Sequence, residues 1–218
     1  ELSSSRVLNE SPVRSLYVHV PFCAHKCEYC AFFSQAPSGD VVNRYVDALV
    51  REMELVAHDL KPRTIFFGGG TPSTFEPQSI RKLLTSVAAT FPREADCEIT
   101  LEANPGTVDS EKFFGYRDAG VNRISVGVQS FQPRLLKFLG RIHSADEAKR
   151  ALITVKQANF NSFSFDLIYA NPGQTLAELE ADLDAALEFQ PPHLSAYNLT
   201  FEEGTPFHHE YRAGKMRN

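Results

Sequence analysis

Three cysteines lie close together in the sequence, at Cys23, Cys27 and Cys30. They cannot all form disulfides with one another, because three is an odd number and cysteines so near in sequence rarely reach disulfide geometry. Soft thiolates bind iron–sulfur clusters and zinc. A structural zinc or electron-transfer site usually closes with four protein ligands, so three leave one metal position open for a small molecule. The C-x3-C-x2-C loop therefore predicts a metal centre.

A zinc knuckle with His25 as the fourth ligand is the alternative interpretation of this loop. His25 lies two residues from Cys23 and two from Cys27, so all ligands would share one short loop, whereas typical zinc sites draw ligand pairs from separated segments. This disfavours zinc but leaves it open. The fourth cysteine, Cys97, lies far away in an apolar run, where we expect a small buried side chain in a strand.

Two further stretches could bind a ligand. A glycine run over residues 68–70 precedes Thr71 and Pro72. A lone glycine run is most often a tight turn, but residues without side chains also let backbone groups approach a charged amino-acid group closely. No Lys-Ser/Thr follows, which argues against a P-loop. Glu102 is either a solvated carboxylate or a group that binds the vicinal hydroxyls of a ribose.

Short β-branched and aromatic runs alternate with segments of helical periodicity. The predicted strands span residues 16–20, 64–67, 98–101, 123–128, 162–168 and 194–199. Apolar residues recur at helical spacing over 42–56 and over 80–91, the second after Pro77. Capping boxes are predicted at Ser144 with Glu147 and at Thr175 with Glu178, and left-handed helix ends at Gly120 and Gly140. This alternation is typical of parallel βαβ units.

We therefore expect an α/β fold, a partial (β/α)6 barrel related to the TIM barrel with parallel strands; a doubly wound sheet is the alternative. The cysteine loop and the glycine run follow the first two predicted strands. Glu102 and Gln129 follow the third and fourth, and Asp166 lies in the fifth. Barrel enzymes build their sites at the C-terminal ends of the strands, so we expect these groups to meet at one rim.

The composition is that of an ordinary globular chain: 218 residues, 43% hydrophobic and 22% charged, with a net charge of -5. Without a basic patch, we expect no nucleic-acid partner. No apolar run reaches the roughly 18 residues of a membrane helix, so we expect no membrane span and a cytoplasmic location; an organelle also fits if a targeting segment was removed before Glu1. We expect a polar extension over 1–13, a core domain over 14–203, and the start of a truncated C-terminal region over 204–218.

The cysteine loop, with Tyr29 directly before Cys30, and the Gly-Gly-Gly-Thr-Pro run together resemble radical S-adenosylmethionine (SAM) enzymes. Finer motifs resemble the oxygen-independent coproporphyrinogen III oxidase-like family. These motifs are LYVHVPFC at 16–23, LEANPG at 101–106, GVQSF at 127–131, LGR at 139–141 and DLIY at 166–169. The resemblance runs in order from residue 16 to about residue 203.

The resemblance implies a [4Fe–4S] cluster on Cys23, Cys27 and Cys30, whose unique iron binds the amino and carboxylate groups of SAM. Electron transfer then cleaves a carbon–sulfur bond to give methionine and a 5'-deoxyadenosyl radical. The implied cofactor contacts are Tyr17, Tyr29, Gly69, Gly70, Thr71 and Glu102, with an outer set of Gln129, Arg141, Asp166 and Thr200. Judged by residue type alone, Gln129 and Asp166 could instead form hydrogen bonds with backbone groups at strand ends. Arg141 could pair with a helix carboxylate, and Thr200 could cap a strand.

One position separates two branches of this family. The oxidase motif has a further cysteine two residues after its third cysteine. This chain has Phe32 at that position, and in this respect it resembles the heme-chaperone branch. The resemblance to the chaperone branch implies a two-domain protein whose C-terminal segment carries a tryptophan-containing signature. This chain has no tryptophan, so we expect the heme-related half to be absent here. We expect His193, His208 and His209 to be solvent-exposed rather than heme ligands.

The leading hypothesis is a radical SAM protein of the heme-chaperone branch, acting in heme or porphyrin metabolism. Its expected partners are SAM, heme or a porphyrin, and an electron donor for the cluster. One alternative is a true oxidase that decarboxylates propionate side chains of coproporphyrinogen III. Another is a non-catalytic heme carrier or a structural metal-binding module. Because a half-barrel leaves a lateral opening, we also expect exposed apolar surface beyond Leu199.

Overall fold

The computed structural model describes residues 13–38, 40–56, 60–91 and 94–216. Six parallel strands form one sheet in sequential order. They are β1 (Val13–Val20), β2 (Leu60–Gly69), β3 (Glu98–Ala103), β4 (Arg123–Gln129), β5 (Ser162–Tyr169) and β6 (His193–Asn198). Strand order follows chain order throughout, which confirms the partial barrel and excludes the doubly wound alternative, whose order reverses at a switch point. The predicted extension over 1–13 lies outside the described residues except for Val13, which begins β1.

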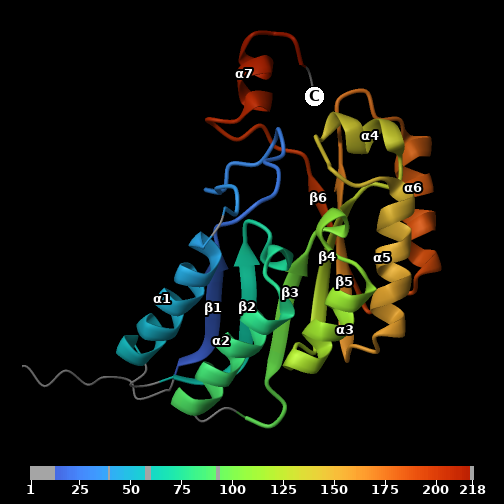
Figure 1. The fold of residues 1–218 in the computed structure, drawn as a ribbon. Coiled ribbons are helices and arrows are strands. Elements are labelled where there is room, and N and C mark those ends of the chain that lie inside the picture. The colour runs from blue at the N-terminus through green and yellow to red at the C-terminus, as the bar shows by residue number, and fades with distance from the viewer. Residues whose placement is uncertain (1–12, 39, 57–59, 92–93, 217–218) are drawn as a thin grey trace, which may run out of the picture.

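Most helices cover the outer face of the curled sheet, whereas α7 lies beyond its end (Figure 1). They are α1 (Val41–Val56), α2 (Pro77–Thr90), α3 (Ser110–Ala119), α4 (Pro133–Phe138), α5 (Ala145–Gln157), α6 (Leu176–Glu188) and α7 (Pro206–Arg212), with short 3-10 turns η2 (Pro72–Thr74) and η3 (Pro105–Thr107). No helix in the described part of the chain is both long and apolar enough to cross a bilayer.

The helix boundaries follow the predicted signals. Ser144 and Thr175 each accept a hydrogen bond from the backbone N–H three residues later, and the glutamate at that position bonds back to complete a capping box. Gly120 closes α3 with a φ of 110°, a left-handed conformation that glycine adopts without steric cost. These predictions are confirmed because each depends on local contacts within one turn of helix.

The two faces of the sheet differ in chemistry. On β4, alternation buries Ile124, Val126 and Val128 under the helices, while Ser125 and Gly127 face the concave side. Neighbouring strands continue the outer apolar layer into one large core. The concave side of β4 instead carries small and polar groups, which leaves room for a ligand at its C-terminal end.

The C-terminal segment packs over the cysteine loop (Figure 1). The N–H of Phe207 donates to the carbonyl of Glu28 at 3.3 Å, and its ring lies 6.4 Å from that of Tyr29. Leu199, Phe207 and Met216 are buried in a second apolar cluster. The expectation of exposed apolar surface beyond Leu199 is therefore largely wrong, because α7 folds back and uses that surface to cover the loop.

Candidate cofactor site

Backbone hydrogen bonds hold the cysteine loop against the end of β1. The N–H of Cys23 donates to the carbonyl of Gln35 at 3.0 Å, and the N–H of Gln35 donates to that of Pro21 at 2.9 Å. A tight turn follows, in which Cys30 N–H donates to the carbonyl of Cys27 at 3.1 Å. All three cysteines are half-buried and line one cavity of about 820 Å³. The loop thus places all three cysteine residues in the wall of the same cavity.

The glycine run lies directly beside the first thiol. Gly70 N–H donates to the carbonyl of Val20, and Thr71 N–H donates to that of Phe22, both at 2.7 Å. A β-carbon on Gly70 would lie 2.7 Å from the Phe22 carbonyl oxygen and 3.1 Å from the sulfur of Cys23. Glycine at position 70 is therefore a steric requirement. The hydroxyl of Thr71 also donates to the Cys23 sulfur at 3.4 Å.

Two carboxylates face the same cavity from β3 and β5. Burial, reinforced by the negative charge of Asp166, raises the pKa of Glu102 to about 7, although the Gly69 N–H donates to Glu102 at 3.3 Å and opposes the shift. Burial also raises the pKa of Asp166, partly offset by a hydrogen bond with Ser195. A ligand that donates hydrogen bonds or carries positive charge would favour the ionised carboxylates.

Buried polar atoms without partners mark the wall that β4 and the following loop provide. Arg141 donates to the sulfur of Cys27 at 3.3 Å and to the carbonyl of Gly127 at 2.8 Å, but its Nε has no partner among the residues that the structure describes. The side-chain oxygen of Gln129 is likewise buried and unpartnered. Such groups are rare in proteins and are expected to bond to a ligand or water.

The structure brings together all but one of the site residues predicted from the sequence. The cavity lining includes Cys23, Cys27, Tyr29, Cys30, Gly69, Gly70, Thr71, Glu102, Gln129, Arg141, Asp166 and Thr200. Tyr17 does not line it. Its ring is 56% exposed on the concave face of β1, stacked on Phe66 at 6.1 Å, with its hydroxyl 3.4 Å from Nδ1 of His19.

The sequence reasoning missed several residues of the lining. Ser125 and Gly127 could have been found from the alternation of β4, since they share the concave face with Gln129. Asn104 also lines the cavity and accepts the N–H of Gly106 at 3.0 Å, which fixes the turn after β3. Tyr197 lines it from β6, and no local motif indicated its role.

Other expectations concern residues away from the cavity. His193 and His209 are exposed as expected, and His208 is half-buried. Cys97 is buried as expected, although it directly precedes β3 instead of lying within it. Within the cavity lining, burial raises the pKa of the Tyr29 hydroxyl.

The donor set fits an iron–sulfur cluster with a bound small molecule. Three thiols share the cavity, the Gly70 backbone lies against Cys23, and Arg141 places positive charge against Cys27. In the described ranges, no three His, Cys, Asp or Glu side chains converge as ligands of a single metal ion. The features that fit a bound cluster and ligand are the shared cavity lining, the close approach of Gly70 to Cys23 and the buried side-chain oxygen of Gln129.

Comparison with known proteins places the chain in a sequence family. The Radical SAM superfamily matches residues 17–186. Heme chaperone HemW of Escherichia coli is 48% identical over 200 residues, which cover 90% of this chain and 53% of that protein. Heme chaperone HemW of Haemophilus influenzae is 44% identical over 213 residues, covering 94% and 55%. The chain thus spans about half the length of the curated relatives it matches.

Solved structures show the same fold. Coproporphyrinogen III oxidase (HemN) from Escherichia coli, described as a radical SAM enzyme, superposes with a TM-score of 0.85 at 26% identity, covering 96% of this chain and 49% of that chain. Methylornithine synthase superposes with a TM-score of 0.61 at 13% identity, covering 91% and 57%, a likeness of fold alone. With the family match extending over most of the sequence and the cysteine loop in place, this chain belongs to the radical SAM superfamily.

Proposed function

We propose that this chain is the cofactor-binding domain of a heme chaperone of the HemW kind, holding a [4Fe–4S] cluster on Cys23, Cys27 and Cys30 with SAM beside it. The observation that carries the proposal is one cavity of about 820 Å³ lined by the three thiols, the glycine run and Glu102. Membership in the superfamily implies both cofactors. The curated relatives named as heme chaperones supply the chaperone part.

In this proposal, different residues of the cavity bind different parts of SAM. The N–H groups of Gly69, Gly70 and Thr71 already donate within the protein, so the carbonyl oxygens of this run would bind the amino group of SAM beside the cysteine loop. Glu102 would accept two ribose hydroxyls, and its raised pKa would fall as those hydrogen bonds form. When bound and reduced, the cluster supplies the electron that cleaves a carbon–sulfur bond of SAM.

The outer set completes the cavity wall. Gln129 would donate or accept through its buried amide, while Arg141 would stabilise negative charge near Cys27. Asp166 and Thr200 line the side of the cavity nearest β6. Tyr17 lies on the concave face of β1 outside the lining, so a contact with SAM would require its exposed ring to turn toward the ligand.

Heme or a porphyrin is the proposed cargo or substrate, and an electron donor the proposed partner. Phe32 is 67% exposed at the cavity mouth, where the oxidase motif has a further cysteine. This favours the chaperone over the oxidase, although the HemN scaffold superposes closely. Turnover of coproporphyrinogen III by the full-length protein would reverse that preference, and heme binding without turnover would support it.

A binding experiment tests the cofactor part of the proposal. Protein is reconstituted with iron and sulfide without oxygen, and SAM affinity is measured by equilibrium dialysis for the unsubstituted protein, Cys30→Ala and Cys97→Ala. Cys97→Ala is the matched control, because Cys97 is a thiol remote from the cavity. We expect iron and SAM binding to be lost only in Cys30→Ala. Equal binding by Cys30→Ala would contradict the proposed ligand set.

A further inference from the structure

The last residue of β4 has a strained backbone. Gln129 has a φ of 72°, in the left-handed region that residues other than glycine seldom adopt. The pairing of β4 with β5 also shifts register between Val126 and Gln129. Such a conformation is energetically unfavourable and persists only where the surroundings enforce it. Its consequence is that the Gln129 side chain lines the cavity, where its oxygen lies buried and unpartnered.

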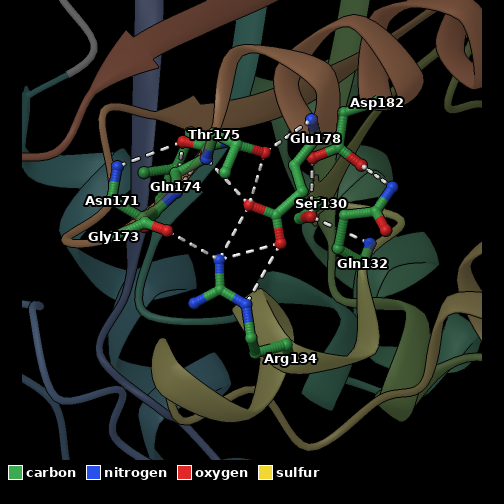
Figure 2. A network of polar contacts seen from close by, with 10 residues as sticks. Ser130, Gln132, Arg134, Asn171, Gly173, Gln174, Thr175, Glu178 and Asp182 are labelled. Carbon is green, nitrogen blue, oxygen red and sulfur yellow. Dashed lines mark hydrogen bonds and ion pairs between the residues drawn. The ribbon is translucent and has the colours of Figure 1, made fainter.

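A carboxylate from α6 fixes the two residues that follow Gln129. Asp182 is 2% exposed. One of its oxygens accepts the hydroxyl of Ser130 at 2.6 Å, and the other accepts the backbone N–H of Phe131 at 2.8 Å. The latter oxygen also accepts the amide of Gln132 at 3.3 Å. Figure 2 shows Asp182 reaching from its helix to Ser130 and Gln132. Both Asp182 oxygens therefore bind donors of the loop between β4 and α4.

A histidine fixes the residue that precedes Gln129. Nε2 of His143 donates to the carbonyl of Val128 at 3.0 Å, and the ring is 3% exposed. Its other nitrogen lies 3.2 Å from the side-chain oxygen of Asn104. With Val128 and Phe131 both held by side chains from other elements, the chain between them has little freedom to relax its left-handed turn.

We propose that Asp182 is a positioning residue for the cofactor cavity: by binding Ser130 and Phe131 it enforces the left-handed turn at Gln129 and so holds the Gln129 amide in the cavity wall. This inference rests on the proposed function, because it assigns the Gln129 amide to a bound cofactor. Asp182 itself is not among the residues that line the cavity. Its effect on SAM would therefore be transmitted through the loop.

The same network contains a matched control. Arg134 on α4 forms a bidentate pair with Glu178 on α6, with both distances from Nη2 at 2.8 Å, and donates to the carbonyl of Gly173 at 3.1 Å (Figure 2). This pair also joins α4 to α6, but it touches neither Ser130 nor Phe131. Glu178→Gln therefore weakens the helix contact while leaving the anchor of Gln129 in place.

The test compares SAM affinity in Asp182→Asn, Asp182→Ala and Glu178→Gln, using reconstituted protein of equal iron content. We expect a loss of about tenfold for Asp182→Ala, a smaller loss for Asp182→Asn, which keeps one acceptor oxygen, and less than twofold for Glu178→Gln. Gln129→Ala supplies a double-mutant cycle. If Asp182 acts through Gln129, Asp182→Asn should cost less than twofold in the Gln129→Ala background.

Additive losses in that cycle would overturn the inference, as would unchanged affinity in Asp182→Ala. A second readout needs no cofactor and keeps the inference testable if the unsubstituted protein fails to bind SAM, an outcome that would defeat the proposed function alone. Hydrogen exchange over residues 128–132 of cofactor-free protein should accelerate at least tenfold in Asp182→Asn and remain unchanged in Glu178→Gln. Equal protection in the two variants would show that Asp182 does not enforce the turn.

Discussion

The outer and concave faces of the sheet are built by alternate residues of the same strands, yet their side chains differ in burial and polarity. On the outer face, side chains such as Phe165 and Ile124 are fully buried against helices. On the concave face, Glu102 and Asp166 have raised pKa values and Gln129 has an unpartnered oxygen. The difference shows that the outer face stabilises the fold, while the concave face keeps polar groups in unfavourable states that a ligand can relieve.

The largest expected effect is on the outer face. Phe165→Ala should lower the free energy of unfolding by about 3–5 kcal/mol, because it removes a fully buried ring that packs edge-on against Phe131. Ser164→Ala, its neighbour on the concave face, should cost less, on the order of 2 kcal/mol, because it loses the hydrogen bond from Arg123 and the one that Ser164 donates to Ser125. Urea unfolding of cofactor-free protein measures both. Equal losses would remove the distinction between the faces.

The next largest effect on stability is expected at the rim of the barrel, where the backbone of Gly70 approaches the thiol of Cys23. Gly70→Ala should cost about 3 kcal/mol and reduce cluster incorporation, because the added methyl meets a carbonyl oxygen and the sulfur of Cys23. Gly106→Ala is the control: its methyl would crowd the side chain of Ile142, which is 43% exposed and can move, and would lie at an ordinary contact distance of 3.5 Å from Cβ of His143. Iron content after reconstitution and urea unfolding report the two effects. Normal iron content in Gly70→Ala would argue against close contact between the glycine run and the cluster.

A pH-dependent stability should distinguish the concave face from the outer face. The pKa of Glu102 is raised from 4.5 to about 7, so between these values the folded protein keeps a proton that the unfolded chain has released. The stability of cofactor-free protein should therefore fall as the pH rises through this range. Glu102→Gln should remove that fall. Between pH 5 and pH 8, the free energy of unfolding of this variant should rise by on the order of 2 kcal/mol relative to that of the unsubstituted protein. Parallel pH profiles in urea unfolding would contradict this account.

The smallest expected effect compares two strained residues at strand ends. Ala170 follows β5 with a φ of 56°, and Gln129 ends β4 with a φ of 72°. Glycine at either position should raise the free energy of unfolding by about 1 kcal/mol or less, since glycine adopts this conformation without strain. Only Gln129→Gly should also weaken SAM binding. Weakened binding in Ala170→Gly would mean that strain at the rim, and not the Gln129 amide, matters for the ligand.

The sequence predicted the strands and the helix starts because these depend on local signals. Runs of β-branched and aromatic residues located all six strands, although β2 begins at Leu60, before Pro62, a residue that usually argues against a strand. Ser144 and Thr175 predicted helix starts because a capping box is complete within four residues. The convergence of the cysteine loop, Glu102 and Asp166 followed from parallel topology, which brings strand ends to one rim.

What the sequence did not predict depends on contacts between distant segments. The turn at Gln129 is fixed by Asp182, which lies 51 residues beyond Phe131 in the chain. The packing of Phe207 over Tyr29 joins the two ends of the described chain, and no local pattern indicates it. Tyr17 was placed among the cofactor contacts by resemblance, whereas the structure leaves it on the concave face outside the cavity lining.

The most direct test of the central claim is electron paramagnetic resonance of the reduced, reconstituted protein, with and without SAM. Cys30→Ala serves as the negative control and Cys97→Ala as the matched positive one. We predict a [4Fe–4S] signal that changes when SAM is added, that persists in Cys97→Ala and that is lost in Cys30→Ala. An iron-free, zinc-containing protein with no such signal would contradict the account.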